Sequence, residues 1–179
     1  MGKSPQRSDR RLTQRLTRVG LLTAMALVLF LVESALPRPL PWMRLGLSNA
    51  AVLATLLLYG AGPALAVSLV KLFVGGLLGG TLAGPAFVIG GSAGVASVAM
   101  MALLYGVVPR VFSPVGLSVA GALVHQVAQL LVAAVYLGHF GLLGLLPMFL
   151  LSGVLSGLLT GLATYFALQR LVAMDEGDA

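Results

Sequence analysis

Three side chains that can carry a charge, Glu33, Lys71 and His125, lie within or at the end of long apolar segments of this sequence. An ionisable group at the centre of a membrane-spanning helix costs about 2.5–3.5 kcal/mol on insertion, so it indicates a functional site by default. An amine and an imidazole in apolar surroundings suit an anionic or hydrogen-bonding ligand. We therefore predict that these residues converge on a small-molecule cavity.

Amide side chains accompany the charged residues. Asn49 and Gln126 lie in apolar stretches, and Gln129 follows His125 by four positions, which places both on one face of a helix. Arg44 lies in the connection before Asn49 and adds a second cation for an anionic ligand group. The predicted substrate-binding residues are therefore Glu33, Arg44, Asn49, Lys71, His125, Gln126 and Gln129.

Glu33 has structural interpretations beside the functional one. It could lie at the membrane interface and pair with Arg38 or Arg44, or it could neutralise Lys71 as a buried pair. In a binding site, Glu33 would instead meet a cationic part of the ligand. The connection over residues 37–43, which holds three prolines, would then act as a mobile lid over the cavity.

His125 and Asn49 also have alternatives. His125 could be a core histidine bonded to a backbone carbonyl, and Asn49 could cap its own helix by accepting from the first-turn amides. The only other histidine is His139, in a loop, and the sequence has no cysteine, so we predict no metal site. Any one of these polar residues could have a purely structural role. A structural role for all of them together is much less expected.

Composition shows what surrounds these residues. The 179 residues are 59% hydrophobic and only 9% charged, against about 45–50% apolar and about 25% charged in soluble domains. Lipid must therefore be the solvent for most of the chain. Because a span takes about 20 apolar residues, the chain has room for about six helices and for no additional soluble catalytic domain.

Glycine and proline divide the apolar sequence into six predicted transmembrane helices. The prolines at 37, 39 and 41 end the first, and the turn at Gly60–Pro63 ends a short second one. The predicted fold is an all-α integral membrane protein with spans at about 19–36, 47–59, 64–80, 86–108, 115–137 and 146–171.

The positions of the basic residues set the expected orientation. Six of the eleven precede the first span, as is typical of cytoplasmic segments, and this placement favours membrane orientation over nucleic-acid binding. With six spans, both termini are cytoplasmic. The predicted organisation is a basic cytoplasmic segment over 1–18, a transmembrane domain over 19–171 and an acidic, solvated and disordered cytoplasmic tail over 172–179.

Small residues recur at four-residue spacing, which lets helix backbones approach closely in lipid. Gly153, Gly157 and Gly161 form one such stripe, which we expect to pack inside the bundle. Gly20 and Ala24 form a shorter one near the cytoplasmic end of the first helix, where a membrane partner could dock.

Several motifs together carry a family resemblance. Glu33-Ser34 before the proline-rich stretch, the segment from Arg44 to Asn49 (RLGLSN), Lys71 before Gly75, and His125 to Gln129 (HQVAQ) are its main elements, over about residues 20–170. The chain resembles the bacterial membrane family called heptaprenyl diphosphate synthase component I, or Gx transporter. That family is in turn similar to the substrate-binding S components of energy-coupling factor (ECF) vitamin transporters.

This resemblance implies an S-component-like bundle of six helices in the bacterial cytoplasmic (inner) membrane. It also implies the partners: a small-molecule substrate, the lipid bilayer, a transmembrane coupling subunit and two ATPase subunits. The Ala-x-x-x-Ala face by which S components meet their coupling subunit is approximated by Gly20 and Ala24. The resulting prediction is a non-enzymatic importer component that needs no cofactor.

Two alternative functions stay open. One is a membrane component of polyprenyl (heptaprenyl) diphosphate synthesis, although such synthases hold magnesium with clustered aspartates, and Asp9, Asp175 and Asp178 all lie in the tails. The other is a stand-alone proton-coupled transporter, in which Glu33 or His125 would relay the proton.

Overall fold

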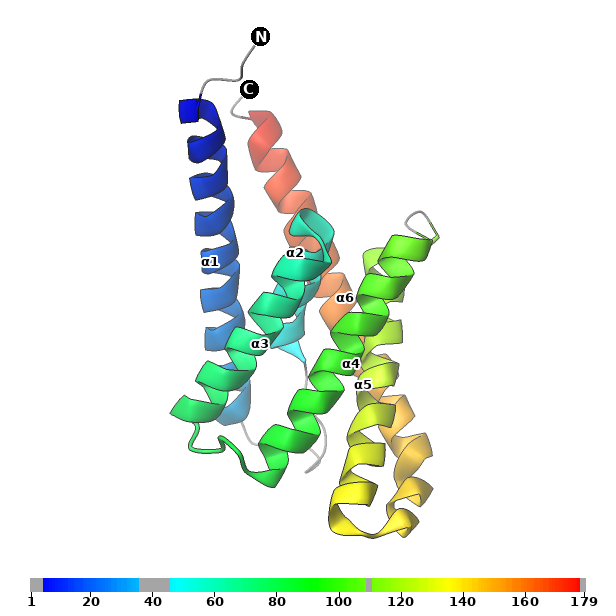
Figure 1. The fold of residues 1–179 in the computed structure, drawn as a ribbon. Helices are drawn as coiled ribbons and strands as arrows, with labels where there is room; N and C mark the ends of the chain where they lie inside the picture. Colours follow the sequence, from blue (N-terminus) through cyan, green and yellow to red (C-terminus); the bar gives the residue numbers. More distant parts are fainter. Residues whose placement is uncertain (1–4, 36–45, 109–110, 178–179) are drawn as a thin grey trace.

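The computed structural model describes the backbone of residues 5–35, 46–108 and 111–177, and the side chains of 12–35, 46–108 and 111–170 (Figure 1). Within these ranges every regular element is a helix. The elements are α1 (Pro5–Ala35), α2 (Leu47–Tyr59), α3 (Ala61–Leu78), α4 (Pro85–Val107), α5 (Pro114–Leu137), the short 3-10 helix η1 (Phe140–Leu145) and α6 (Leu146–Gly177).

The helix ends follow from local sequence. Proline begins α4 and α5, where its fixed φ suits a first turn and its missing N–H is not needed. The Ser113 hydroxyl caps α5 by accepting from the backbone N–H of Gly116 at 3.1 Å. Gly138 ends α5 in the left-handed conformation, with φ of 66°, which L side chains rarely adopt.

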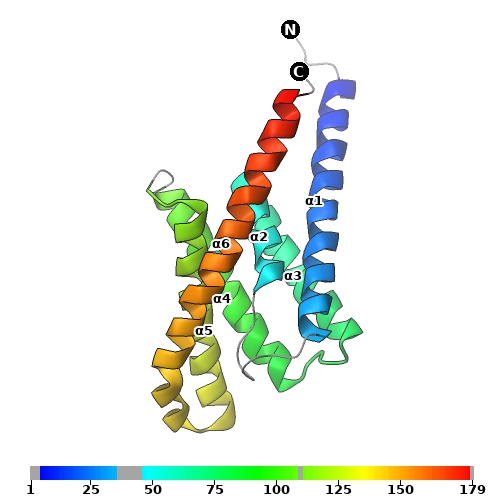
Figure 2. The same cartoon turned by 180° about the vertical axis from the view of Figure 1, so that it is seen from behind.

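Five helical segments are long and apolar enough to cross a membrane: 12–35 in α1, α3, α4, α5 and the combined η1–α6 segment. With the shorter α2 included, the six described α-helices run alternately up and down the bundle, so the start of α1 and the end of α6 lie at the same end, called here the terminal end (Figures 1 and 2). The protein is therefore an all-α, multi-pass membrane protein, as the sequence predicts.

The second helix does not need full membrane length. α2 has 13 residues, which gives a length of about 20 Å against a hydrocarbon core of about 30 Å. It lies inside the bundle, in contact with α1, α3, α5 and α6, and residues 51–56 are all buried. Its first residue therefore lies within the bundle and not at a membrane surface.

One terminal expectation is wrong: α6 continues to Gly177, so most of the tail expected to be disordered is helical. At the other end, the helix that holds the first span begins at Pro5, before the apolar residues expected from about 19. The predicted limits mark where the apolar sequence stops. A helix propagates beyond that point because each added residue gains a hydrogen bond without a new nucleation step, and the terminal residues include good helix formers.

The bundle consists of two groups of helices. α1, α2 and α3 contact one another, and α5 contacts both α4 and α6 in the second group. The groups meet where α3 contacts α4 and where α2 contacts α5 and α6. Two hydroxyl hydrogen bonds from α6 to α2 cross this boundary: Thr160 Oγ1 donates to Gly46 O and Thr164 Oγ1 donates to Ala50 O, both at 3.3 Å.

The glycine stripe of α6 packs against α5, as expected. A Cβ atom added at Gly157 would lie 2.7 Å from Val119 Cα, and one at Gly161 would lie 2.7 Å from Val115 Cα. These backbones approach so closely that no other residue fits without a shift. The stripe therefore fixes the α5–α6 pair inside the bundle.

The stripe formed by Gly20 and Ala24 is different. Both residues are exposed on α1, and a Cβ atom added at Gly20 would meet nothing within 4 Å. This face is uncovered in the isolated chain. Its use by a partner stays a prediction.

Ten of the buried apolar residues form a cluster toward the terminal end of the bundle. In each contributing helix they lie nearer to that end than the polar residues described below. The apolar cluster comprises Ala26, Ala51, Val52, Leu53, Leu56, Ala64, Val67, Val98, Met101 and Leu117. It separates the middle of the bundle from the terminal end.

Candidate functional site

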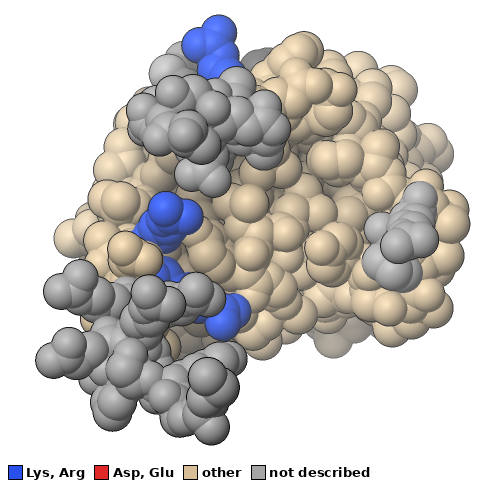
Figure 3. Space-filling model, turned by 90° about the horizontal axis from the view of Figure 1, so that it is seen from above, with Lys and Arg blue, Asp and Glu red and all other residues tan. Residues whose placement is uncertain are grey.

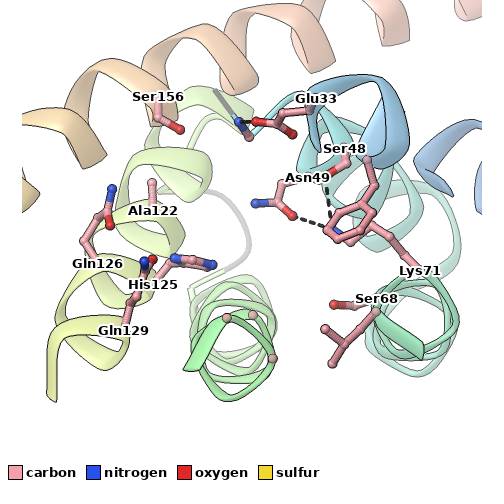
Figure 4. Close-up of a pocket in the computed structure, with 16 residues that line it drawn as sticks. Glu33, Ser48, Asn49, Ser68, Lys71, Ala122, His125, Gln126, Gln129 and Ser156 are labelled. Carbon is pink, nitrogen blue, oxygen red and sulfur yellow. Dashed lines mark hydrogen bonds between the residues drawn. The ribbon is translucent and has the colours of Figure 1, made fainter. Parts of the chain in front are cut away.

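A cavity of about 70 Å³ lies between the two groups of helices, and all six α-helices contribute to its wall. Six of the seven predicted site residues line it: Glu33, Asn49, Lys71, His125, Gln126 and Gln129 (Figure 4). Arg44 and the connection predicted as a lid, 37–43, lie outside the described residues. The structure thus brings together residues that are up to 96 positions apart in sequence; their role in binding stays a prediction.

Lys71 occupies the wall formed by α2 and α3. Its side chain is only 6% exposed, and it lies about 15 Å along α3 from the first residue of that helix. The ammonium group donates to Asn49 Oδ1 at 2.7 Å and to Ser48 Oγ at 3.4 Å. Asn49 does not cap α2, since the N-cap is Gly46 and has no side-chain cap bond; instead its amide orients the Lys71 ammonium.

Glu33 has a contact that none of its three sequence-based interpretations included. Its carboxylate accepts a hydrogen bond from the backbone N–H of Gly46, the residue that begins α2. A carboxylate is favourable at this position because the N-terminus of a helix carries partial positive charge. At the other end of α2, Arg15 Nη2 donates to Tyr59 O at 2.9 Å, so α1 supplies a matching charge to each end of the buried helix.

Gly46 has to be glycine for two reasons. Its φ of 75° is left-handed, and an added Cβ atom would lie 2.9 Å from Ser156 Oγ of α6. The start of α2 can therefore lie directly against α6. This contact places Ser48 and Asn49 in the cavity wall.

The α5 wall carries hydrogen-bonding side chains at helical spacing. Ala122, His125, Gln126 and Gln129 follow one another at intervals of one or three residues and share one face. Gln126 is 6% exposed, and its Nε2 donates to Ser152 Oγ at 3.0 Å. The Ser152 hydroxyl in turn donates to Phe149 O at 2.8 Å, so this serine accepts from Gln126.

The other atom of the Gln126 amide is not satisfied. Oε1 is buried and has no hydrogen-bond partner within the described part of the chain. Leaving a buried acceptor without a donor costs about 1–3 kcal/mol, so such atoms in a native protein call for an explanation. Because this oxygen is itself buried, a molecule in the cavity does not reach it.

The α4 wall presents backbone and no side chains. Gly90, Gly91 and Gly94 line the cavity, and an added Cβ atom at Gly94 would meet nothing within 4 Å. Gly94 is seven positions before the buried Met101, so both lie on the inward face of α4. The open space next to Gly94 is therefore part of the cavity.

Several wall residues were not predicted from the sequence, among them Ser48, Ser68, Ser156 and the three glycines of α4. Serine and glycine are common in membrane helices, so their types alone carry little information. The spacing was informative: Ser152, Ser156, Thr160 and Thr164 recur every four residues along α6. Of these, Thr160 and Thr164 bond to α2, and Ser152 bonds to Gln126.

The arrangement is suited to binding. Among the described residues there is no group of three or more His, Cys, Asp or Glu side chains that could hold a metal ion. The wall offers one ammonium, several amides and hydroxyls, and an imidazole, while its carboxylate bonds to the backbone of α2. Such a set could recognise a polar molecule by charge and hydrogen bonds.

The contact of Glu33 leads to a stability prediction. We expect Glu33→Ala to lower the free energy of unfolding by about 1–3 kcal/mol, because the buried N–H of Gly46 loses its acceptor. Glu33→Gln keeps an oxygen acceptor and should lose less. Thermal unfolding in detergent measures both; equal, negligible losses would contradict a capping role.

Comparison with known proteins supplies one finding about identity. Among curated proteins there is no significant match to this chain, and there is none among solved structures. A family model described as heptaprenyl diphosphate synthase component I matches residues 22–167, most of the chain and every helix that lines the cavity. This protein therefore belongs to the heptaprenyl diphosphate synthase component I family.

Proposed function

We propose that this protein is the substrate-binding (S) component of an ECF-type importer, which captures a small molecule from outside and passes it inward. The observation that carries the proposal is the cavity itself. Each of the six α-helices, or the residue that begins it, contributes to its wall, and the buried Lys71 ammonium donates there to Asn49 and Ser48. Because polar groups are unfavourable at this depth, a cavity that collects them favours binding over packing.

The orientation proposed for the bundle agrees with import. Exposed arginines at 15, 18 and 170 lie near the terminal end, and Figure 3 shows blue Lys and Arg side chains along one side of that face. Basic residues favour the cytoplasmic side, so we place both termini in the cytoplasm of a bacterium and the bundle in its inner membrane. The apolar cluster then lies between the cavity and the cytoplasm.

Inward release would need external energy. We propose that a transmembrane coupling subunit contacts the uncovered α1 face at Gly20 and Ala24 and that two ATPase subunits drive it. Close helix contact at small residues is a common mode of association in lipid. On this proposal the chain binds and releases its substrate without catalysing a reaction.

The test combines purification with native mass spectrometry. The tagged protein, extracted from its own membrane in mild detergent, should retain a small molecule and bring down two ATPase subunits. We expect Lys71→Gln to reduce the retained fraction by tenfold or more, because a hydrogen bond to a charged group contributes about 1.5–3 kcal/mol. Retention unchanged in this variant would show that the cavity is not the binding site.

The family description favours a second candidate, a membrane component of heptaprenyl diphosphate synthesis. That function predicts magnesium-dependent chain elongation by membranes that contain this protein, and its loss on deletion, without co-purifying ATPases. A proton-coupled transporter, the third possibility, predicts uptake by the lone protein in vesicles when a pH gradient is applied. Either result would replace the importer proposal.

A further inference from the structure

An open groove lies at the terminal end of the bundle, between α1 and the last residues of α2. It has a volume of about 460 Å³ and is lined by Gln14, Arg15, Arg18, Leu58 and Tyr59. Both arginines are exposed, and Figure 3 shows blue side chains and no red one among the described residues on this face. The groove therefore offers positive charge to a ligand outside the bundle.

The described part of the chain does not neutralise this charge. Arg15 Nη2 donates to Tyr59 O at 2.9 Å, which uses one of the five N–H donors of its guanidinium group and holds the side chain at the end of α2. Glu33 is the only acidic residue whose side chain is described, and it lies 15 positions after Arg18, about 22 Å along α1. The arginines are therefore able to bind an external anion.

More arginines precede the groove in the same helix. α1 begins at Pro5, and Arg7 and Arg11 precede Arg15 by eight and four positions. At about 100° per residue, positions 7, 11, 15 and 18 fall on one side of α1. The helix therefore places a row of basic positions, and not an isolated pair, at its terminal end.

An exposed apolar stripe continues from Arg18 along α1. Leu21, Met25, Val28 and Val32 follow at spacings of three and four residues, which keeps them on one face of the helix. Their exposed fractions are 66%, 45%, 58% and 51%, so the bundle leaves this stripe uncovered. The stripe is about 17 Å long, which is about half the thickness of the hydrocarbon core of a bilayer.

The groove and the stripe together suit a ligand that has an anionic head and a hydrocarbon tail. Guanidinium groups bind phosphate through paired, charge-assisted hydrogen bonds, which are stronger than neutral ones. A soluble anion would contact the arginines alone, whereas a lipid would also cover the apolar stripe. Basic pockets between transmembrane helices are a recurrent type of site for acidic lipid head groups.

We propose that the groove binds the phosphate head group of an anionic phospholipid, with an acyl chain along the stripe over 21–32. Gln14 adds an amide N–H donor beside the two arginines. The site is separate from the α1 face proposed for the coupling subunit, because Gly20 and Ala24 are rotated from Arg18 by about 200° and about 240° around the helix. The lipid site is therefore independent of the importer proposal, and absence of co-purifying ATPases would refute only the importer.

The test compares two phospholipids with identical acyl chains. The full chain, delipidated in detergent, is titrated in native mass spectrometry with phosphatidylglycerol, which is anionic, and with phosphatidylcholine, which is neutral overall. We expect phosphatidylglycerol to bind about tenfold or more tightly, and the difference to shrink as salt is added. Equal affinity for the two lipids would overturn the proposal.

Variants assign the preference to the groove. Arg18→Gln should weaken phosphatidylglycerol binding by about fivefold or more and leave phosphatidylcholine binding unchanged, whereas Arg18→Lys keeps the charge and should retain most of the affinity. Arg170→Gln is the matched control, because Arg170 is an exposed arginine near the same end that does not line the groove. An equal loss in Arg18→Gln and Arg170→Gln would refute a defined site.

The same assay decides between the lipid and two other occupants. Inorganic phosphate that displaces phosphatidylglycerol at equal concentration would identify a site for a soluble anion. A several-fold gain in lipid affinity on replacing Asp175, Glu176 and Asp178 by their amides would show that the acidic tail of the chain occupies the groove. Either result would overturn the proposal, whereas weak competition by phosphate and unchanged affinity in the tail variant support it.

Discussion

Replacing Gly94 by leucine is expected to abolish ligand binding while leaving the protein folded. A Cβ atom at this position meets nothing within 4 Å, so the backbone accepts a side chain without a clash. The added isobutyl group would extend from the inward face of α4 into a cavity of only about 70 Å³. The change also replaces glycine in a helix interior, which by itself adds about 0.5–1 kcal/mol of stability.

The measurement is the fraction of purified protein that retains its small molecule in native mass spectrometry, beside the thermal unfolding midpoint. Gly106→Leu is the matched control, because it lies on the same helix, also meets nothing within 4 Å, and does not line the cavity. We expect full retention in the control and none in Gly94→Leu. Equal retention in both would place the ligand elsewhere.

Replacing Gly157 by valine is expected to lower the free energy of unfolding by about 3 kcal/mol or more. The new Cβ atom would lie 2.7 Å from Val119 Cα and 3.2 Å from Ser118 O, both backbone atoms that cannot rotate away. Relief would require α5 and α6 to move apart along the stripe. Overpacking of this kind typically costs about 1–3 kcal/mol, and backbone contacts raise the cost.

Gly106→Val again supplies the control, since it introduces the same side chain into a helix without a neighbour. Thermal unfolding in detergent and the folded yield in membranes report the difference. Because α5 carries His125, Gln126 and Gln129, loosening this pair should also weaken ligand retention. A Gly157→Val protein as stable as the control would show that the stripe is not tightly packed in the membrane.

The helices could be predicted well because lipid imposes a simple rule on sequence. Apolar runs ended by glycine and proline correctly placed α2, α4 and α5 to within one or two residues. α1 and α6 extend past the predicted apolar spans because a helix continues wherever its residues permit. The apolar composition of a segment indicates which residues contact lipid. It does not indicate where the backbone hydrogen bonds of the helix end.

The convergence of Lys71, His125 and the amides could also be anticipated, since polar groups at membrane depth have to face the bundle interior. Their individual contacts could not. Glu33 accepts from a backbone amide 13 residues away, and that contact depends on how deeply α2 begins. The glycine wall of α4 was invisible because an absent side chain has no chemical signature until a neighbouring void is known.

The division of the bundle into two groups has a consequence for turnover. On the proposed function, a cargo that contacts wall residues of both groups would act as a tether between them. Any motion that frees the cargo by parting the groups must work against its own binding energy, so each tenfold gain in affinity adds about 1.4 kcal/mol to that work. In an importer of this design, a high affinity that helps to capture a substrate from dilute surroundings would also slow the release of that substrate to the cytoplasm.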